Sequence, residues 1–229
     1  AMSGGVHQER NLQDAVVEHL GARGWLTSKG LAGYDKARAL YTPDLLAWLE
    51  ESDPENYGRI VPATGDEAAI ERGQNRILDR VVKVLSADET QGGGTLNALR
   101  NGFDLPGARR FLLFQFPPAE ERNPKVVARY AMNRLRVVEE LVYSDKHRNR
   151  LDLTLFLNGL PVATVEIKTE FTQSLDQAII QYKTERLPQG EPLLQAGRGA
   201  LVHFAATENR IAMTTELKGP ETFFLPFDQ

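Results

Sequence analysis

One apolar segment of the chain carries an acid at its entrance and an acid–lysine pair at its exit. In LDLTLFLNGLPVATVEIKTE, Asp152 is the second residue, and Glu166 and Lys168 lie near the end. Two runs rich in β-forming residues flank Asn158-Gly159, a strong signal for a hairpin turn. The hairpin would bring the three charged side chains to the same end of two paired strands.

The turn of this hairpin decides whether Asp152 and Glu166 share a face. Side chains alternate across a strand, so Glu166 and Lys168 point to one face. A plain two-residue turn pairs residue 157 with residue 160 and places Asp152 on the other face. A three-residue loop, or a bulge in one strand, would place Asp152 opposite Glu166, with side-chain carbons about 5 Å apart. The sequence therefore predicts a longer loop or a bulge.

Two opposed carboxylates suit a divalent cation, because they repel one another and are costly to bury without a counter-ion. Mg²⁺ prefers oxygen ligands, so Asp152, Glu166 and the backbone carbonyl of Ile167 could hold it. Lys168 could then help to deprotonate a metal-bound water or balance the charge on a phosphate. This chemistry would hydrolyse a phosphodiester bond. The alternative is that Glu-x-Lys on a strand is only a solvated salt bridge.

The composition, with 41% hydrophobic and 25% charged residues in 229, is that of a globular domain. No run approaches the ~18 apolar residues of a membrane span, and no signal peptide is recognisable. The absence of Cys excludes a disulfide framework and a thiol nucleophile, and fits a cytoplasmic location. The net charge of −4 predicts weak attraction to nucleic acid overall, so DNA binding would need a local basic patch or partner subunits.

The charged residues must be positioned by a sheet with helices around it. Apolar spacing predicts helices over 10–23, 36–51, 66–86 and 174–186, and strands over 137–143, both arms of the hairpin, 199–207, 211–217 and the run TFFLPF. Strands on both sides of a helix in the second half indicate an α/β fold with a mixed sheet. We interpret residues 1–125 as a helical and loop elaboration and 126–229 as the core of a single structural domain.

Longer motifs resemble a known family. The stretch YAMNRLRVVEELVYS…NRLDLTLFLNGLPVATVEIK, followed by QAIIQYKTER, LVHFAATENRIAMTTELKG and TFFLPF, resembles the N-terminal nuclease domain of the restriction (R) subunit of type I restriction-modification enzymes. The resemblance implies a PD-(D/E)xK nuclease core, a mixed central sheet flanked by helices. It also implies that Asp152, Glu166 and Lys168 are the catalytic residues and act with Mg²⁺ on double-stranded DNA.

Several positions depart from the pattern of this family. Leu151 stands where the motif name has proline. Many relatives carry Gln-x-x-x-Tyr on the helix after the hairpin, whereas here Gln177 precedes Tyr182 by five residues. Either both contact DNA, or Gln177 belongs to a capping box and Tyr182 to the core. The family often has an acid in its first helix that aids the metal site, but counting back from Trp25 places Gln13 there.

Basic residues before the hairpin could contact the DNA backbone. Arg148 and Arg150 directly precede Asp152, beside the expected position of the scissile phosphate. A solvated turn is the alternative interpretation. His203 lies in the apolar run LVHFAA, which favours a buried core histidine over a catalytic one.

The preferred function is a Mg²⁺-dependent endonuclease domain whose sequence specificity comes from partners, the methyltransferase and specificity subunits of the restriction complex. ATP would serve only a translocase part of the full subunit, because the chain has no G-x-x-x-x-G-K-[ST] loop. The alternative is an inert or masked docking module that links the motor to the methyltransferase core. An unrelated α/β hydrolase is disfavoured by the absence of G-x-S-x-G.

Overall fold

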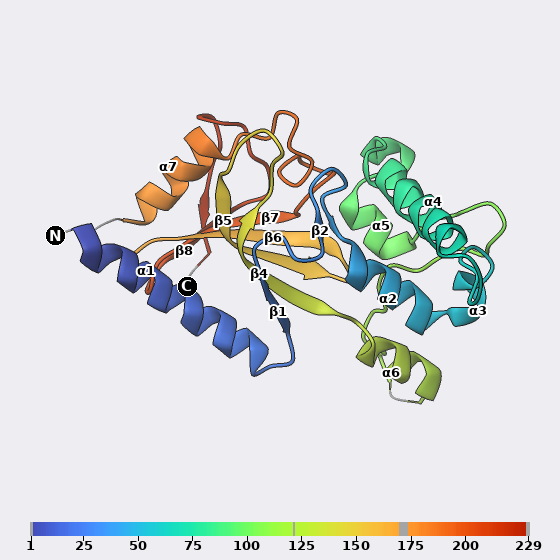
Figure 1. Cartoon of the computed structure of the whole chain (residues 1–229). Helices are drawn as coiled ribbons and strands as arrows, with labels where there is room; N and C mark the ends of the chain where they lie inside the picture. The colour runs from blue at the N-terminus through green and yellow to red at the C-terminus, as the bar shows by residue number, and fades with distance from the viewer. Residues whose placement is uncertain (1, 121, 170–173, 228–229) are drawn as a thin grey trace.

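A mixed sheet of seven strands forms the centre of the computed structural model, which describes residues 2–120, 122–169 and 174–227 (Figure 1). The strand order within this described part is β1-β4-β5-β6-β7-β8-β9. The pairs β1–β4 and β6–β7 are parallel and the other pairs are antiparallel. The strands are β1 (Leu26–Lys29), β4 (Leu135–Val142), β5 (Arg150–Leu157), β6 (Leu160–Ile167), β7 (Val202–Ala206), β8 (Ile211–Thr214) and β9 (Leu225–Pro226).

One helix covers each face of this sheet. On α1 (Met2–Gly21), the apolar side chains of Leu12, Val16 and Leu20 pack with buried residues of β4, β5 and β6. On α7 (Leu175–Glu185), Leu175 and Ala178 pack with β7 and β8 on the opposite face. This arrangement confirms the predicted fold class, a mixed sheet flanked by helices.

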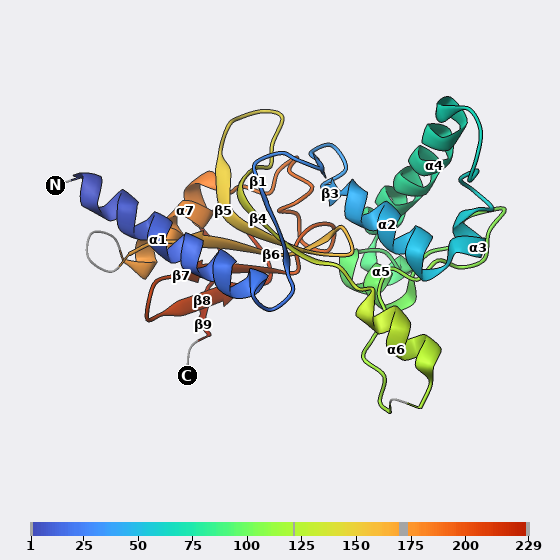
Figure 2. The ribbon, with the colours of Figure 1, turned by 60° about the horizontal axis from the view of Figure 1, so that its bottom comes forward.

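A group of helices lies at the end of the sheet away from α1 and α7 (Figure 2). It comprises α2 (Thr42–Ser52), α3 (Pro54–Tyr57), α4 (Glu67–Leu85), α5 (Thr95–Asn101) and α6 (Pro124–Ala131), with a 3-10 turn at Glu89–Gln91. Trp48 and the apolar face of α4 form its core, and Leu160 of the hairpin packs into the same cluster. The hairpin is therefore anchored at its turn by these helices. No helix of the described residues is long and apolar enough to cross a membrane.

The structure differs from the sequence predictions between residues 34 and 57. The predicted helix over 36–51 begins only at Thr42, because Tyr34–Asp35 (β2) pairs with Leu40–Tyr41 (β3). Ala39, with φ of 53°, breaks any helix before that point. The stretch expected to be a loop after residue 52 contains α3, which is capped by the Asp53 side chain.

The predicted boundary at residue 125 does not separate the sheet from the elaboration. β1 pairs with β4 inside the central sheet, and α1 covers its face. The predicted capping box on α7 is also not formed, since the Ser174 side chain makes no capping hydrogen bond. The helix instead begins with the Gln177 amide donating to the Ser174 carbonyl at 2.9 Å.

The hairpin of β5 and β6 contains the bulge that is needed to place Asp152 and Glu166 on the same face of the sheet. Its turn is a two-residue one, because Leu157 pairs with Leu160, and Asn158 and Gly159 both have positive φ. The register then shifts between Leu155 and Phe156, which leaves Val162 as the extra residue on β6. Beyond the bulge Leu153 pairs with Val165. The shift therefore places residue 152 opposite residue 166, as the sequence predicted.

Candidate active site

The first side chain of the site, Asp152, bridges the two hairpin strands at the point where their regular pairing ends. Its Oδ2 accepts a hydrogen bond from the Ile167 backbone amide at 2.6 Å. Burial raises the pKa of the half-buried Asp152 carboxyl, while this amide and the nearby Lys168 act in the opposite direction. The Asp152 carboxylate thus takes the place of a backbone carbonyl as the acceptor for the Ile167 amide. This hydrogen bond fixes the carboxylate at the open end of the hairpin.

Glu166 is fully buried beside Asp152. Its Oε1 accepts a hydrogen bond from Nε of Arg186 at 2.5 Å, and its Oε2 has no hydrogen-bond partner among the described residues. Burial, and then the charge of Asp152, raise the pKa of Glu166 to about 8, although Arg186 opposes this shift. A buried oxygen without a partner is costly and usually has a functional explanation.

Arg186 is the cation that accompanies Glu166, and sequence reasoning missed it. The guanidinium is 3% exposed and also donates to the Arg150 carbonyl at 2.7 Å. Arg186 caps the C-terminus of α7, so it ties this helix to the entrance of β5 and to the end of β6. In the sequence it is an arginine at the end of a helix, where cations are ordinary, and no pattern marks it as buried.

Lys168 faces an acid on α1. Its Nζ lies 3.7 Å from Oε2 of Glu9, and both side chains are largely buried. Burial raises the pKa of Glu9, with a smaller contribution from Asp152, and Lys168 lowers it. Oε1 of Glu9 has no hydrogen-bond partner within the described ranges.

Glu9 is the acid of α1 that lies beside Lys168. The position reached by counting back from Trp25 is Gln13, which donates to Glu139 at 3.4 Å. Glu9 lies four residues earlier, one helical turn along the same face. It fell outside the helix predicted from residue 10, because α1 begins at Met2.

An open pocket of about 560 Å³ is lined by Glu9, Gln13, Glu140, Asp152 and Ile167, among others, whereas Glu166 and Lys168 do not line it. Glu140 has φ of 52° in the middle of β4, a left-handed conformation that costs a non-glycine residue about 1–2 kcal/mol. Its carboxylate pairs with Arg150 at 3.2 Å. Strained residues are often retained at functional sites, and this one lies on β4 between the residues that pair with Leu151 and Leu153, across from Asp152.

The residues predicted to contact DNA occupy different environments. Arg148, Arg150 and Gln177 are exposed. Tyr182 is fully buried, and its hydroxyl lies 2.8 Å from that of Thr164. Tyr182 is therefore not exposed for contact with DNA. It lies in the core, which was the alternative interpretation of this residue.

His203 belongs to the same buried network. Its Nδ1 lies 2.7 Å from the Thr164 hydroxyl, and burial lowers the pKa of the imidazole to about 3. This geometry matches the sequence interpretation of a core histidine.

The residues around Asp152 provide some, but not all, of the oxygen ligands that a divalent cation such as Mg²⁺ needs. No group of three or more His, Asp and Glu side chains converges on one point in the part of the chain that the structure describes. However, the carboxylates of Asp152 and Glu166 lie at the mouth of the hairpin, and no donor among the described residues reaches the buried Oε2 of Glu166. Asp152, Glu166 and the Ile167 carbonyl could hold such an ion, with waters completing its coordination.

Comparison with protein-family models gives a match over residues 13–221 to the family described as the type I restriction enzyme R protein N terminus. A comparison with curated proteins gives no match. The matched region includes the whole hairpin, α7 and every strand from β1 to β8. The chain therefore belongs to the family of type I restriction enzyme R protein N-terminal regions.

Proposed function

We propose that this chain is a Mg²⁺-dependent endonuclease domain that hydrolyses phosphodiester bonds of double-stranded DNA. The observation that carries the proposal is the pair Asp152–Glu166, which the bulge places opposite one another. Asp152 lines the open pocket, and Glu166 lies buried beside it with one oxygen that has no partner in the described part of the chain. Membership of the restriction-enzyme family supports this choice over other metal-dependent hydrolases.

The residues around the pair have distinct roles in this proposal. A bound Mg²⁺ would supply a Lewis acid and a water of lowered pKa. Asp152 and Glu166 would hold the ion, and Arg186 fixes the orientation of the Glu166 carboxylate. Lys168, released from Glu9, would stabilise the negative charge that develops on the scissile phosphate. Glu9 would orient a water on the α1 side of the pocket.

The partners proposed for the chain follow from its family and its charge. The methyltransferase and specificity subunits of a cytoplasmic restriction complex would supply the recognition of sequence. A translocase part of the full R subunit would consume the ATP. The net charge of −4 supports this division, because a domain with weak DNA affinity of its own depends on partners to present the substrate.

A docking role is the second candidate, and a row of exposed apolar side chains favours it. Phe223, Leu225 and Phe227 are 74%, 54% and 56% exposed along the last strand of the sheet. Exposed aromatic residues in a row are typical of surfaces that contact another protein or domain. The two functions are compatible, since none of these three side chains lines the pocket beside Asp152.

The test of the enzymatic role is DNA nicking by the assembled restriction enzyme. Asp152→Asn, Glu166→Gln and Lys168→Met are each expected to abolish nicking of supercoiled DNA while ATP-driven translocation continues. Asp176→Asn, at an exposed acid in the first turn of α7, is the matched control and should cut normally. If the three variants cut as fast as the wild type, the domain acts only as a docking module.

A further inference from the structure

A second open pocket adjoins the candidate active site. It measures about 570 Å³, and three of its residues, Leu31, Val142 and Arg150, also line the first pocket. The remaining lining comes from Lys36 in the turn between β2 and β3 and from the connection between β4 and β5. The two pockets therefore form neighbouring parts of one groove, with Arg150 between them.

Cations dominate the lining of this second pocket. Lys36, Lys146, Arg148 and Arg150 contribute four positive charges, and His147 lies beside them. Three acids oppose them: Asp145 is 3.7 Å from Lys36, Glu191 is 3.8 Å from Lys146, and Glu140 is 3.2 Å from Arg150. Arg148 makes no ion pair within the described ranges of the chain. The pocket thus carries a net positive charge on a chain that is negative overall.

The ion pairs around this pocket are loosely held. Each has at least one partner that is more than half exposed, and exposed pairs of this kind contribute little to stability. A phosphate oxygen can therefore replace the carboxylate partner of Lys36, Lys146 or Arg150 at little cost. Charge-assisted hydrogen bonds to phosphate are stronger than those to neutral acceptors.

The segment 144–146, between β4 and β5, is held in place by hydrogen bonds. The Ser144 hydroxyl donates to Glu191 at 2.7 Å and accepts from the Lys146 amide at 3.0 Å. The Lys146 ammonium donates to the Gly190 carbonyl at 3.0 Å and fills the space that a side chain at this glycine would need. These contacts hold Lys146 in place beside the pocket before any ligand binds.

We propose that this second pocket is a subsite for the DNA backbone, which holds phosphates next to the scissile one. The inference rests on the proposed nuclease function. Its cations come from two separate segments and surround an open groove, an arrangement that suits a row of phosphates better than one small anion. Arg150, between the pockets, contacts the phosphate nearest to the cut. Lys36 and Lys146 hold the next ones, and none of these contacts reads a base.

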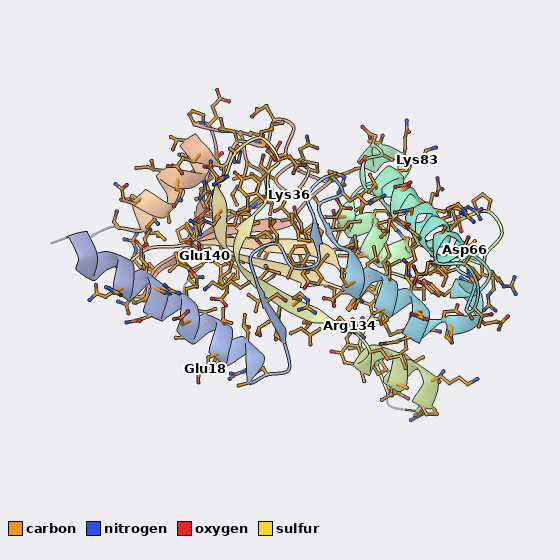
Figure 3. The ribbon with its side chains drawn as sticks, viewed as in Figure 1. Glu18, Lys36, Asp66, Lys83, Arg134 and Glu140 are labelled. Carbon is orange, nitrogen blue, oxygen red and sulfur yellow. The ribbon has the colours of Figure 1, made fainter. Side chains whose placement is uncertain are left out.

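The experiment measures duplex binding by fluorescence anisotropy, with Ca²⁺ in place of Mg²⁺ to prevent cutting and at low salt. Lys36→Ala/Lys146→Ala is compared with Arg72→Ala/Lys83→Ala, which removes the same charge from the exposed side of α4. In Figure 3 Lys83 is labelled on α4 in the group of helices at one end of the molecule, and Lys36 is labelled near the middle. Removing two phosphate contacts should lower the affinity about tenfold and reduce the slope of log K against log salt by about 1.8. The α4 variant should change neither.

The outcomes separate this inference from the proposed function. Equal effects of the two double variants, or no duplex binding by the wild type at low salt, would overturn the subsite. In the assembled enzyme, Lys36→Ala/Lys146→Ala should raise the DNA concentration needed for half-maximal nicking and leave the saturated rate within about twofold. If Asp152→Asn abolishes nicking and the Lys36/Lys146 variant nicks and binds as the wild type does, the nuclease function stands and the subsite is wrong.

Discussion

Removing Arg186 from its ion pair with Glu166 should destabilise the fold far more than the same change at an exposed ion pair of equal separation. The two side chains are 3% and 0% exposed, with Nε and Oε1 2.5 Å apart. Arg186→Met leaves a buried carboxylate without its cation, which typically costs about 3–5 kcal/mol. The pair Arg110–Asp104 has the same 2.5 Å separation but is 58% and 62% exposed. Arg110→Met is therefore the matched control, and its effect on stability should be small because solvent screens this pair.

The cost of Arg186→Met should also depend on pH. Burial places the pKa of Glu166 near 8 in the folded chain, above its ordinary value of 4.5. Loss of Arg186 raises it further. At pH 6 Glu166 is therefore protonated in both the wild type and the variant, and the variant avoids most of the penalty. Above about pH 8 the wild type releases this proton and the variant still holds it, so the deficit of the variant grows by about 1.4 kcal/mol for each pH unit until its own pKa is reached.

The assay is urea unfolding followed by tryptophan fluorescence at pH 6 and at pH 9. Midpoints at constant m-value give the change in the free energy of unfolding. We expect a larger deficit for Arg186→Met at pH 9 than at pH 6, and a small, pH-independent deficit for Arg110→Met. Equal deficits for the two variants, or a deficit that shrinks at pH 9, would refute the assignment of Arg186 as the counter-ion of a buried carboxylate.

Three further predictions follow from the same contacts. Because the folded pKa of His203 is about 3, below its ordinary value, the stability that its neutral form provides is present above pH 6.5 and is lost on acidification. His203→Leu should therefore remove a pH dependence of up to about 1.4 kcal/mol per unit between pH 6 and 4, measured by thermal unfolding. Asn158→Ala should lower the free energy of unfolding by about 2–4 kcal/mol, because Asn158 is buried with φ of 47° and forms hydrogen bonds with Arg134, Leu113 and Asn133. Asn158→Gly should lower it less, because glycine tolerates the left-handed conformation. Equal losses for the two variants would show that this conformation is unimportant. Glu9→Gln should weaken Mn²⁺ affinity about tenfold, whereas Asp14→Asn, on an exposed face of the same helix, should leave it unchanged in a calorimetric titration.

The hairpin could be predicted in detail because its constraints are local. The period-two alternation, the Asn158-Gly159 signal and the charges at both ends require a bulge or a longer loop if Asp152 and Glu166 are to share a face. The structure supplies the bulge at Val162. The strands of the second half and the helix α7 follow from the same kind of periodicity, with ends that agree to within a few residues.

The rest of the site depends on contacts between segments far apart in the chain. Arg186 is 20 residues beyond Glu166, and Glu9 comes from a helix on the other face of the sheet. Lys36 was expected within a helix, and the pairing of β2 with β3 places it in a turn beside the groove. No local pattern encodes these neighbours, since each is an ordinary charged residue at the surface of its own element.

We propose that Asp152 and Glu166, which the bulge brings opposite one another, hold a divalent cation. A calorimetric titration of this chain with Mn²⁺ tests this directly, for the wild type, Glu166→Gln and the control Asp176→Asn. Binding heat is expected in the wild type and in Asp176→Asn, and its loss in Glu166→Gln. Heat of the same affinity and stoichiometry in Glu166→Gln would contradict the claim.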